Sequence, residues 1–281
     1  MTYLRKPEWL KIKIHSEKEF SNVSQVIKSH GLHTICTSGR CPNLSECWNR
    51  GTATLMILGE ICTRSCKFCN TLTGKPLPLD PKEPQEVAES IQLMKLKHAV
   101  ITSVDRDDLP DGGAQQWAHT IRAIKTLNPD TTIEILIPDF DGKIELIDLI
   151  IAEKPNIISH NLETVERLTP LIRTKAKYLT SLKVLKHISS QGVIAKTGIM
   201  LGLGENETEV LQLMDDALTN GCTVLTIGQY MQPSRKNISV SEYITPEKFG
   251  KYKEIGLKKG FRQVESGPLV RSSYCAEKHL L

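Results

Sequence analysis

The stretch "TATLMILGEICTRSCKFC", residues 52–69, decides the fold and places the chemistry within it. Its first seven residues form an aliphatic and β-branched run, which is typical of a strand that is buried on both faces. Three cysteines, Cys62, Cys66 and Cys69, follow directly. Because α/β folds carry their chemistry at the carboxyl ends of parallel strands, the stretch predicts a buried strand that leads into a thiol-rich functional loop.

Five similar runs follow, and helical patterns separate them. They lie at residues 99–104, 131–137, 156–160, 193–201 and 223–228. Val210, Leu213 and Ala217 mark the clearest amphipathic stripe, and Asn206 with Glu209 predicts the capped start of that helix. Alternating strands and helices indicate consecutive βαβ units around a parallel sheet. We therefore predict an α/β fold, a partial (β/α)6 TIM-type barrel, since six units are fewer than the eight of a closed barrel.

Segments on both sides extend this predicted barrel. Residues 1–51 form an N-terminal extension with three further cysteines, and 1–52 are expected to be irregular. The barrel is assigned to residues 52–265. Residues 266–281 form a C-terminal segment that contains the motif R-S-S-Y at 271–274.

The composition limits the class of protein. Of 281 residues, 40% are hydrophobic and 24% are charged, as in ordinary globular proteins. A net charge of +4 is too small to indicate nucleic-acid binding, and no apolar run approaches the ~20 residues of a membrane span. We expect a cytoplasmic protein that binds neither nucleic acid nor membrane. In a reducing compartment, clustered cysteines indicate metal binding or catalysis rather than disulfides.

The spacing C-x3-C-x2-C of residues 62–69 supplies three ligands from one short loop. Three thiolates suit three irons of a [4Fe–4S] cluster, and the fourth iron then keeps an open position for a substrate. The alternative is a zinc site that His98 or His160 completes.

This loop resembles that of the radical S-adenosylmethionine superfamily, with Phe68 in the aromatic position of C-x3-C-x-aromatic-C. The resemblance implies that Cys62, Cys66 and Cys69 hold a cluster whose open iron binds the amino and carboxylate groups of S-adenosylmethionine. Reductive cleavage would then release a 5′-deoxyadenosyl radical. Phe68 would pack near the adenine.

A second triplet, Cys36, Cys41 and Cys47, is spaced C-x4-C-x5-C. Two clusters need eight ligands, and only six cysteines are local. S-adenosylmethionine would take one of the two remaining positions, so the other needs a further residue. Both triplets, "SVDRDDLPDGGA", "ISHNLETV", "KTGIMLGLGE", "LTIGQYMQPS" and the final "VESGPLVRSSY" closely resemble the lipoyl synthase family over most of the chain.

That resemblance implies a second, auxiliary [4Fe–4S] cluster on Cys36, Cys41 and Cys47, with a serine of the R-S-S-Y motif as fourth ligand. We assign Ser273, with Ser272 as the alternative, and place Arg271 of the same motif among the catalytic residues. The auxiliary cluster would be the sulfur source and would be dismantled during turnover. An ordinary polar tail is the competing interpretation, and Cys275 is a possible rival ligand.

Further residues are candidates for contacts with S-adenosylmethionine. Asn161 and Glu163 are predicted to bind its ribose or amino group, and Arg173 its carboxylate. The turn with Gly202 and Glu205 is predicted to lie near the adenosine, although it lacks the third glycine of a dinucleotide-binding motif. The acidic loop 105–113 would suit the rim of the site. A solvated polar face and mere turn chemistry remain the alternatives.

The family resemblance implies a sulfurtransferase that inserts sulfur at C6 and C8 of an octanoyl-lysine and consumes two S-adenosylmethionines. The octanoyl group would be carried by the lipoyl domain of a 2-oxoacid dehydrogenase E2 or by a glycine-cleavage H protein. A flavodoxin or ferredoxin would supply electrons. Alternatives are a biotin-type sulfur inserter and an iron–sulfur carrier or scaffold, although a carrier needs far less chain.

Overall fold

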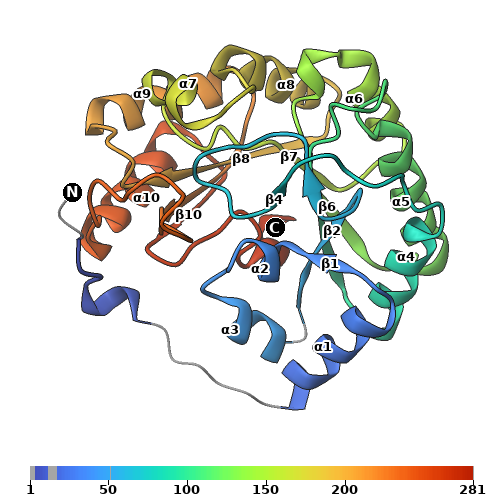
Figure 1. Ribbon diagram of the computed structural model, residues 1–281. Coiled ribbons are helices and arrows are strands. Elements are labelled where there is room, and N and C mark those ends of the chain that lie inside the picture. Colours follow the sequence, from blue (N-terminus) through green and yellow to red (C-terminus); the bar gives the residue numbers. More distant parts are fainter. Residues whose placement is uncertain (1–3, 12–17, 51, 281) are drawn as a thin grey trace. The chain divides into compact units, whose positions relative to one another are not determined.

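The computed structural model describes residues 4–11, 18–50 and 52–280 (Figure 1). These residues divide into two compact units. The N-terminal unit contains residues 18–50, 52–65 and 70–158, and the C-terminal unit contains 4–11, 66–69 and 159–280. All six predicted strands are present. They are β2 (Thr54–Ile57), β5 (His98–Ser103), β6 (Thr132–Leu136), β7 (Ile157–Ser159), β8 (Ile194–Leu201) and β9 (Val224–Gln229).

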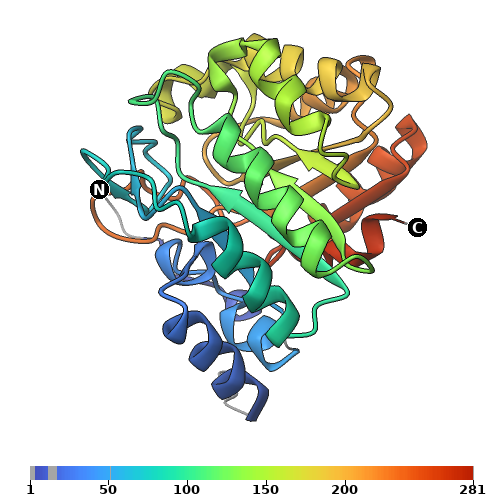
Figure 2. The ribbon, with the colours of Figure 1, turned by 90° about the vertical axis from the view of Figure 1, so that its right-hand side faces the viewer.

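In the N-terminal unit the strands follow the order β2-β5-β6-β7, with β2, β5 and β6 parallel. The short β1 (His33–Thr34) pairs antiparallel with β2, and β3 (Ile61–Cys62) pairs with β4 (Leu72–Thr73). Helices α4 (Glu83–Leu93), α5 (Ala114–Leu127) and α6 (Ile144–Ile151) lie side by side (Figure 2). They pack there because each buries one apolar stripe, such as Trp117, Ile121 and Ile124 of α5, which are all 0% exposed.

The prediction that residues 1–52 are irregular is wrong for the described part. This region contains η1 (Glu8–Leu10), α1 (Lys18–Ser29), α2 (Ile35–Ser38) and α3 (Leu44–Asn49). The spacing of Phe20, Val23 and Ile27 was a helical signal, and these side chains pack together in a small apolar cluster. Helices α2 and α3 are too short to produce a recognisable apolar period.

The C-terminal unit contains β8, β9 and a further strand, β10 (Gln263–Gly267), all parallel. Besides η1, its helical segments are η3 (Glu166–Leu168), α7 (Thr169–Ile172), α8 (Tyr178–Ser190), α9 (Glu207–Thr219), α10 (Pro246–Lys259) and η4 (Ala276–Leu280). Strand β10 was not predicted, because "QVESG" has one apolar residue, Val264, and is extended through its pairing with β9. Across the described chain, no helix combines the length and apolarity needed to cross a membrane.

Helix α9 begins and ends as the sequence predicts. Asn206 Oδ1 accepts a hydrogen bond from the Glu209 backbone N–H at 2.9 Å, and Glu209 Oε2 accepts one from the Asn206 N–H at 2.9 Å. Gly221 follows the helix with φ +76°, a left-handed conformation that glycine adopts without strain. The capping box thus fixes the helix that follows β8.

Replacing Glu209 by glutamine should make the stability of the folded chain depend less on pH in the acid range. Hydrogen bonds from Arg167 and Asn206 lower the pKa of Glu209 to about 2, below the roughly 4.3 of an unfolded glutamate. The stabilisation is therefore complete above the unfolded pKa and is lost as the pH falls toward 2. The melting temperature of Glu209→Gln should fall less between about pH 5 and 2 than that of the parent. Glu254→Gln, which changes an exposed carboxylate of α10, is the control and should leave the slope unchanged.

Candidate functional site

Cys62 ends β3 in the N-terminal unit, and its sulfur lies among backbone donors. Its Sγ atom accepts hydrogen bonds from the backbone N–H groups of Arg64 and Asp105, both at 3.4 Å. Asp105 belongs to the loop after β5, so two loops meet at this sulfur. Such N–H···S contacts are among the interactions that stabilise cluster thiolates. All eight cysteines are thiols rather than disulfides.

Three carboxylates hold the side chain of Arg64, which is only 4% exposed. Its Nε and Nη2 donate to Asp107 at 2.8 and 2.9 Å, and Nη2 also donates to Asp139 at 2.8 Å. Asp105 lies 3.3 Å from Nε. This network fixes Arg64, two positions after Cys62, and thereby the loop that contains the first predicted cluster ligand. The acids of loop 105–113 thus bind an arginine that the sequence did not single out.

Cys66 and Cys69 belong to the C-terminal unit. The Cys69 N–H donates to the Cys66 carbonyl oxygen at 3.0 Å, and Asn237 Nδ2 donates to the Cys69 carbonyl oxygen at 2.7 Å. The backbone of Lys67 bonds to Ile172 and Ile238 at 2.8 and 3.0 Å. Between them, Phe68 packs against the apolar core of this unit. Residues 66–69 are therefore held in place through their backbone.

The second triplet lies within the N-terminal unit. Cys36 is in α2, Cys47 is in α3, and the Cys41 N–H donates to the Cys36 carbonyl oxygen at 2.9 Å. Burial raises the pKa of Cys36, and burial together with the charges of Cys41 and Cys36 raises that of Cys47 to about 12. Thiols that oppose each other's ionisation deprotonate together when a cation compensates their charge. The donor set therefore suits an iron–sulfur cluster.

The assignment of the cysteines and Ser273 as metal ligands remains a prediction. Within the described residues, no three His, Cys, Asp or Glu side chains converge in an arrangement that could hold a metal ion. The histidines of the zinc alternative have other partners. His98 Nδ1 lies 2.8 Å from Thr132 Oγ1, and His160 Nε2 lies 2.9 Å from Ser181 Oγ.

Asn161 connects two predicted site residues of the C-terminal unit. Its Nδ2 donates to Glu163 Oε1 at 3.0 Å and to Ser272 Oγ at 2.7 Å. Its Oδ1 is buried and has no hydrogen-bond partner among the described residues. A buried acceptor without a donor is costly in an empty site, so this atom fits an amino or hydroxyl group of a ligand.

Glu163 and Arg173 lie next to this amide. Glu163 has φ +67°, which is uncommon outside glycine and is often found at functional sites. Backbone bonds to Gly198 and Met200 hold it against β8. Burial raises the pKa of Glu163, and the charge of Arg173 opposes that rise. Arg173 Nη1 donates to Ser181 Oγ at 3.0 Å. The structure thus brings Asn161, Glu163 and Arg173 together as a polar group.

The turn after β8 is stabilised by its own glutamate. The Glu205 carboxylate accepts N–H groups of Gly202 and Leu203 at 2.6 and 2.9 Å. Gly202 has φ +95°, and a Cβ atom there would lie 2.2 Å from Gln229 Nε2. Turn chemistry accounts for both residues, and their proximity to adenosine remains a prediction.

The R-S-S-Y motif follows β10. Ser272 accepts the hydrogen bond from Asn161, and the Tyr274 N–H donates to the Arg271 carbonyl oxygen at 2.9 Å. The Arg271 guanidinium turns back to the Val270 carbonyl oxygen at 2.7 Å. Ser273 is half-buried, and Cys275 has φ +51°. The motif is therefore an ordered turn, which contradicts the alternative of an ordinary polar tail. Its metal binding is still a prediction.

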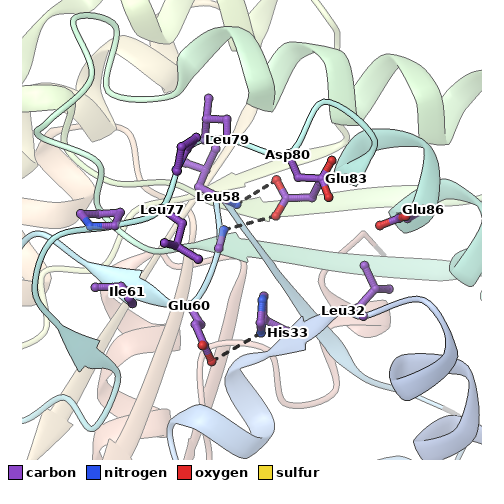
Figure 3. A pocket seen from close by; sticks show the side chains of 14 residues that line it. Leu32, His33, Leu58, Glu60, Ile61, Leu77, Leu79, Asp80, Glu83 and Glu86 are labelled. Atoms are coloured by element: carbon purple, nitrogen blue, oxygen red, sulfur yellow. Dashed lines mark hydrogen bonds and ion pairs between the residues drawn. The ribbon is translucent and has the colours of Figure 1, made fainter.

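A cavity of about 180 Å³ lies elsewhere in the N-terminal unit (Figure 3). Glu83, at its wall, accepts the backbone N–H groups of Leu58 and Gly59 at 3.0 and 3.3 Å. Both residues have positive φ, so the carboxylate stabilises the turn between β2 and the Cys62 loop. None of the predicted site residues belongs to the lining of this cavity.

Comparisons with known proteins agree with these motifs. Residues 56–217 match the profile of the Radical SAM superfamily. The chain is 66% identical over 278 residues to "Lipoyl synthase" of Parabacteroides distasonis, covering 99% of each chain. It is 60% identical over 277 residues to "Lipoyl synthase" of Treponema denticola, covering 99% of this chain and 96% of the relative.

Two solved structures share the fold at low sequence identity. Streptococcus suis SuiB bound to S-adenosylmethionine has a TM-score of 0.59 and 9% identity, over 79% of this chain and 54% of that one. HydG, a maturase of the [FeFe]-hydrogenase, has a TM-score of 0.58 and 13% identity, over 81% and 61%. These likenesses confirm the predicted α/β fold with its partial TIM-type barrel.

Proposed function

Because this chain belongs to the lipoyl synthase family of the radical S-adenosylmethionine superfamily, we propose specific residues for the chemistry of that family. Lipoyl synthases are sulfurtransferases that act on protein-bound octanoyl groups with S-adenosylmethionine and two [4Fe–4S] clusters. The product here is lipoyl-lysine, with sulfur at C6 and C8. In our proposal, Cys62, Cys66 and Cys69 hold one cluster, and Cys36, Cys41 and Cys47 with Ser273 hold the other.

When bound, the first cluster supplies the electron that cleaves S-adenosylmethionine, and the auxiliary cluster supplies sulfur. The protein's own groups orient and protect these partners. The N–H groups of Arg64 and Asp105 stabilise the Cys62 thiolate. Asn161 Oδ1 accepts a donor of S-adenosylmethionine, while Glu163 and Arg173 offer charges to its amino and carboxylate groups.

Ser273 is assigned by its position in the R-S-S-Y motif, and Ser272 has a hydrogen bond of its own. Ser272 Oγ already accepts a hydrogen bond of 2.7 Å from the buried Asn161 amide. Binding iron through Ser272 would break that contact. Serine is a harder ligand than thiolate, so the iron at this corner should be the first to leave. That property suits a cluster that gives up sulfur.

The partners are proposed from the chemistry of the substrate. The octanoyl group is carried by a lipoyl domain of a 2-oxoacid dehydrogenase E2 or by a glycine-cleavage H protein, and a flavodoxin or ferredoxin supplies electrons. We place the reaction in the cytoplasm, because six cluster thiols require a reducing compartment. The observation that carries the function is the presence of two cysteine triplets and an ordered R-S-S-Y turn in one barrel chain.

Substrate class is tested with reconstituted protein, S-adenosylmethionine, dithionite and an octanoyl-lysine peptide under anaerobic conditions. The expected product is the peptide with two added sulfur atoms, together with 5′-deoxyadenosine. Deoxyadenosine without sulfur incorporation would leave a radical enzyme of another substrate class, such as a biotin-type inserter. Release of neither product would favour an iron–sulfur carrier.

Ser273→Ala should weaken the auxiliary cluster selectively. Iron in the anaerobically prepared chain should fall from about eight atoms toward about four, while S-adenosylmethionine cleavage continues. Ser272→Ala is the matched variant and should retain its iron, because that hydroxyl is bonded to Asn161. Iron and sulfide assays with chromatography of deoxyadenosine provide the readout. Full iron content together with full sulfur insertion in Ser273→Ala would refute the assignment.

A further inference from the structure

Three glycines open one face of the strands in the C-terminal unit. Gly228 of β9 pairs with Gly267 of β10, and Gly198 lies on β8. Side chains alternate along a strand, and the neighbours Ile199 and Ile227 belong to the apolar core that the helices cover. Gly198, Gly228 and Gly267 therefore lie on the opposite face, which we call the glycine face.

The chain after β10 lies directly on the glycine face (its C-terminal end is red in Figure 1). A Cβ atom at Gly228 would lie 2.1 Å from the Val270 carbonyl oxygen. At Gly198 it would lie 3.2 Å from Ser272 Oγ, and at Gly267 3.3 Å from Val270 Cγ2. At Gly228, only glycine permits this close approach of two backbones. The start of the R-S-S-Y motif is thus seated against the strands.

A second attachment lies at the other end of the segment. Lys196 precedes Gly198 by two residues on β8 and so lies on the same face. Its Nζ is 3.0 Å from Nδ1 of His279 in η4, and both residues are 0% exposed. Arg262 Nη2 donates to the His279 carbonyl oxygen. The side chain and the main chain of His279 are both held.

The Lys196–His279 contact is expected to stabilise the folded chain. An ammonium group enclosed by protein is costly unless its hydrogens meet acceptors. Nδ1 of a neutral His279 is such an acceptor for Lys196. Removing either side chain removes this buried contact, so we expect the pair to contribute to docking of the segment.

We propose that Lys196 and His279 form an anchor that keeps segment 268–280 on the glycine face and thereby positions Ser273 for the auxiliary cluster. The inference rests on the proposed role of Ser273 as a ligand. Lys196 and His279 act through the segment and are positioning residues.

The anchor is tested in the full-length chain by hydrogen exchange of residues 268–280 before reconstitution. Lys196→Met and His279→Leu should increase exchange there about tenfold or more. His279→Asn retains an acceptor near the Nδ1 position and should restore slow exchange. Lys278→Met changes the exposed neighbour and is the matched control, which should behave as the parent.

The consequence for the cluster is read by Mössbauer spectroscopy of reconstituted chains in which Cys62, Cys66 and Cys69 are alanine. Only the auxiliary cluster then contributes. The signal of the iron without a cysteine ligand should change in Lys196→Met and His279→Leu and return in His279→Asn. A merely structural role of the pair would leave that signal unchanged, which would overturn the positioning role.

These outcomes distinguish the Lys196–His279 anchor from the assignment of Ser273 as a ligand. Parent-like exchange in both Lys196→Met and His279→Leu overturns the anchor, as does faster exchange that extends equally through β8 and β9. Ser273→Ala tests the ligand on its own. If the Mössbauer signal is the same with alanine at 273, the ligand assignment fails, even where exchange shows that the anchor exists.

Discussion

Replacing Cys62 by alanine is expected to abolish cleavage of S-adenosylmethionine, whereas replacing Cys36 should spare cleavage and abolish sulfur insertion. The two residues belong to separate structural elements, since Cys62 ends β3 and Cys36 lies in α2. In our proposal, each loss would remove a ligand from a different cluster. The affected reaction should slow at least about a thousandfold, or ~4 kcal/mol in barrier. Anaerobic assays that measure deoxyadenosine and sulfur-containing peptide in parallel distinguish the two effects.

Cys222 provides the matched control for this pair. It is also a buried thiol, but its Sγ lies 3.4 Å from the carbonyl oxygens of Ala195 and Val224 within the strands. Cys222→Ala should preserve both reactions and the iron content. Equal loss of deoxyadenosine in Cys36→Ala and Cys62→Ala would contradict the division into two clusters. Iron analysis shows whether a variant has lost one cluster or both.

Arg64→Gln should produce the largest loss of stability among the changes considered. Removing the guanidinium takes away the cation that lies 2.8 Å from Asp139, whose side chain is 3% exposed. The negative charges of Asp105 and Asp107 remain nearby. Breaking a buried ion pair in this way costs about 3–5 kcal/mol. The midpoint of urea unfolding of the metal-free chain should fall accordingly. Because the loop at Cys62 loses its support, the cluster proposed there should also release iron more readily.

Arg106→Gln is the matched control for Arg64. Arg106 is equally buried, and its side chain binds Asp108 at 2.8 Å through both Nε and Nη2. The Asp108 side chain is 36% exposed, so water can replace the lost partner. The control should therefore lose less stability and keep the iron at Cys62. An equal fall of the urea midpoint in both variants would contradict this prediction. It would show that removing the cation from the buried carboxylates around Arg64 destabilises the chain no more than removing it from the exposed Asp108.

The elements that sequence predicted correctly are those with local signals. The six strands were predicted from short apolar runs, because strands that are buried on both faces need apolar residues at successive positions. Helix α9 was predicted from its apolar stripe and its capping box. Strand β10 and helices α1, α2 and α3 were missed. In β10 a single buried side chain, Val264, accompanies a full set of hydrogen bonds to β9. Backbone pairing leaves little trace in residue type.

The residues of the candidate site also fall into two groups: those that the sequence indicates and those whose role depends on the folded structure. The thiol triplets could be read as candidate ligand sets, because the spacing of soft ligands along a loop limits what they can bind. R-S-S-Y became a candidate only through the family resemblance. The role of Gly228 could not be read, since its requirement for hydrogen as a side chain arises from the segment that packs on it. The same holds for Arg64, whose role depends on which acids surround it.

By itself, the sequence determined the βαβ order, the family and the residue types that can bind iron and sulfur, because those follow from periodicity and spacing over a few residues. Only the tertiary structure decided which side chains position them. Arg64 meets Asp139 across 75 residues, Lys196 meets His279 across 83, and Asn161 meets Ser272 across 111. The physical reason is that a hydrogen bond depends on distance in space, and only the folded chain brings such partners within 3 Å.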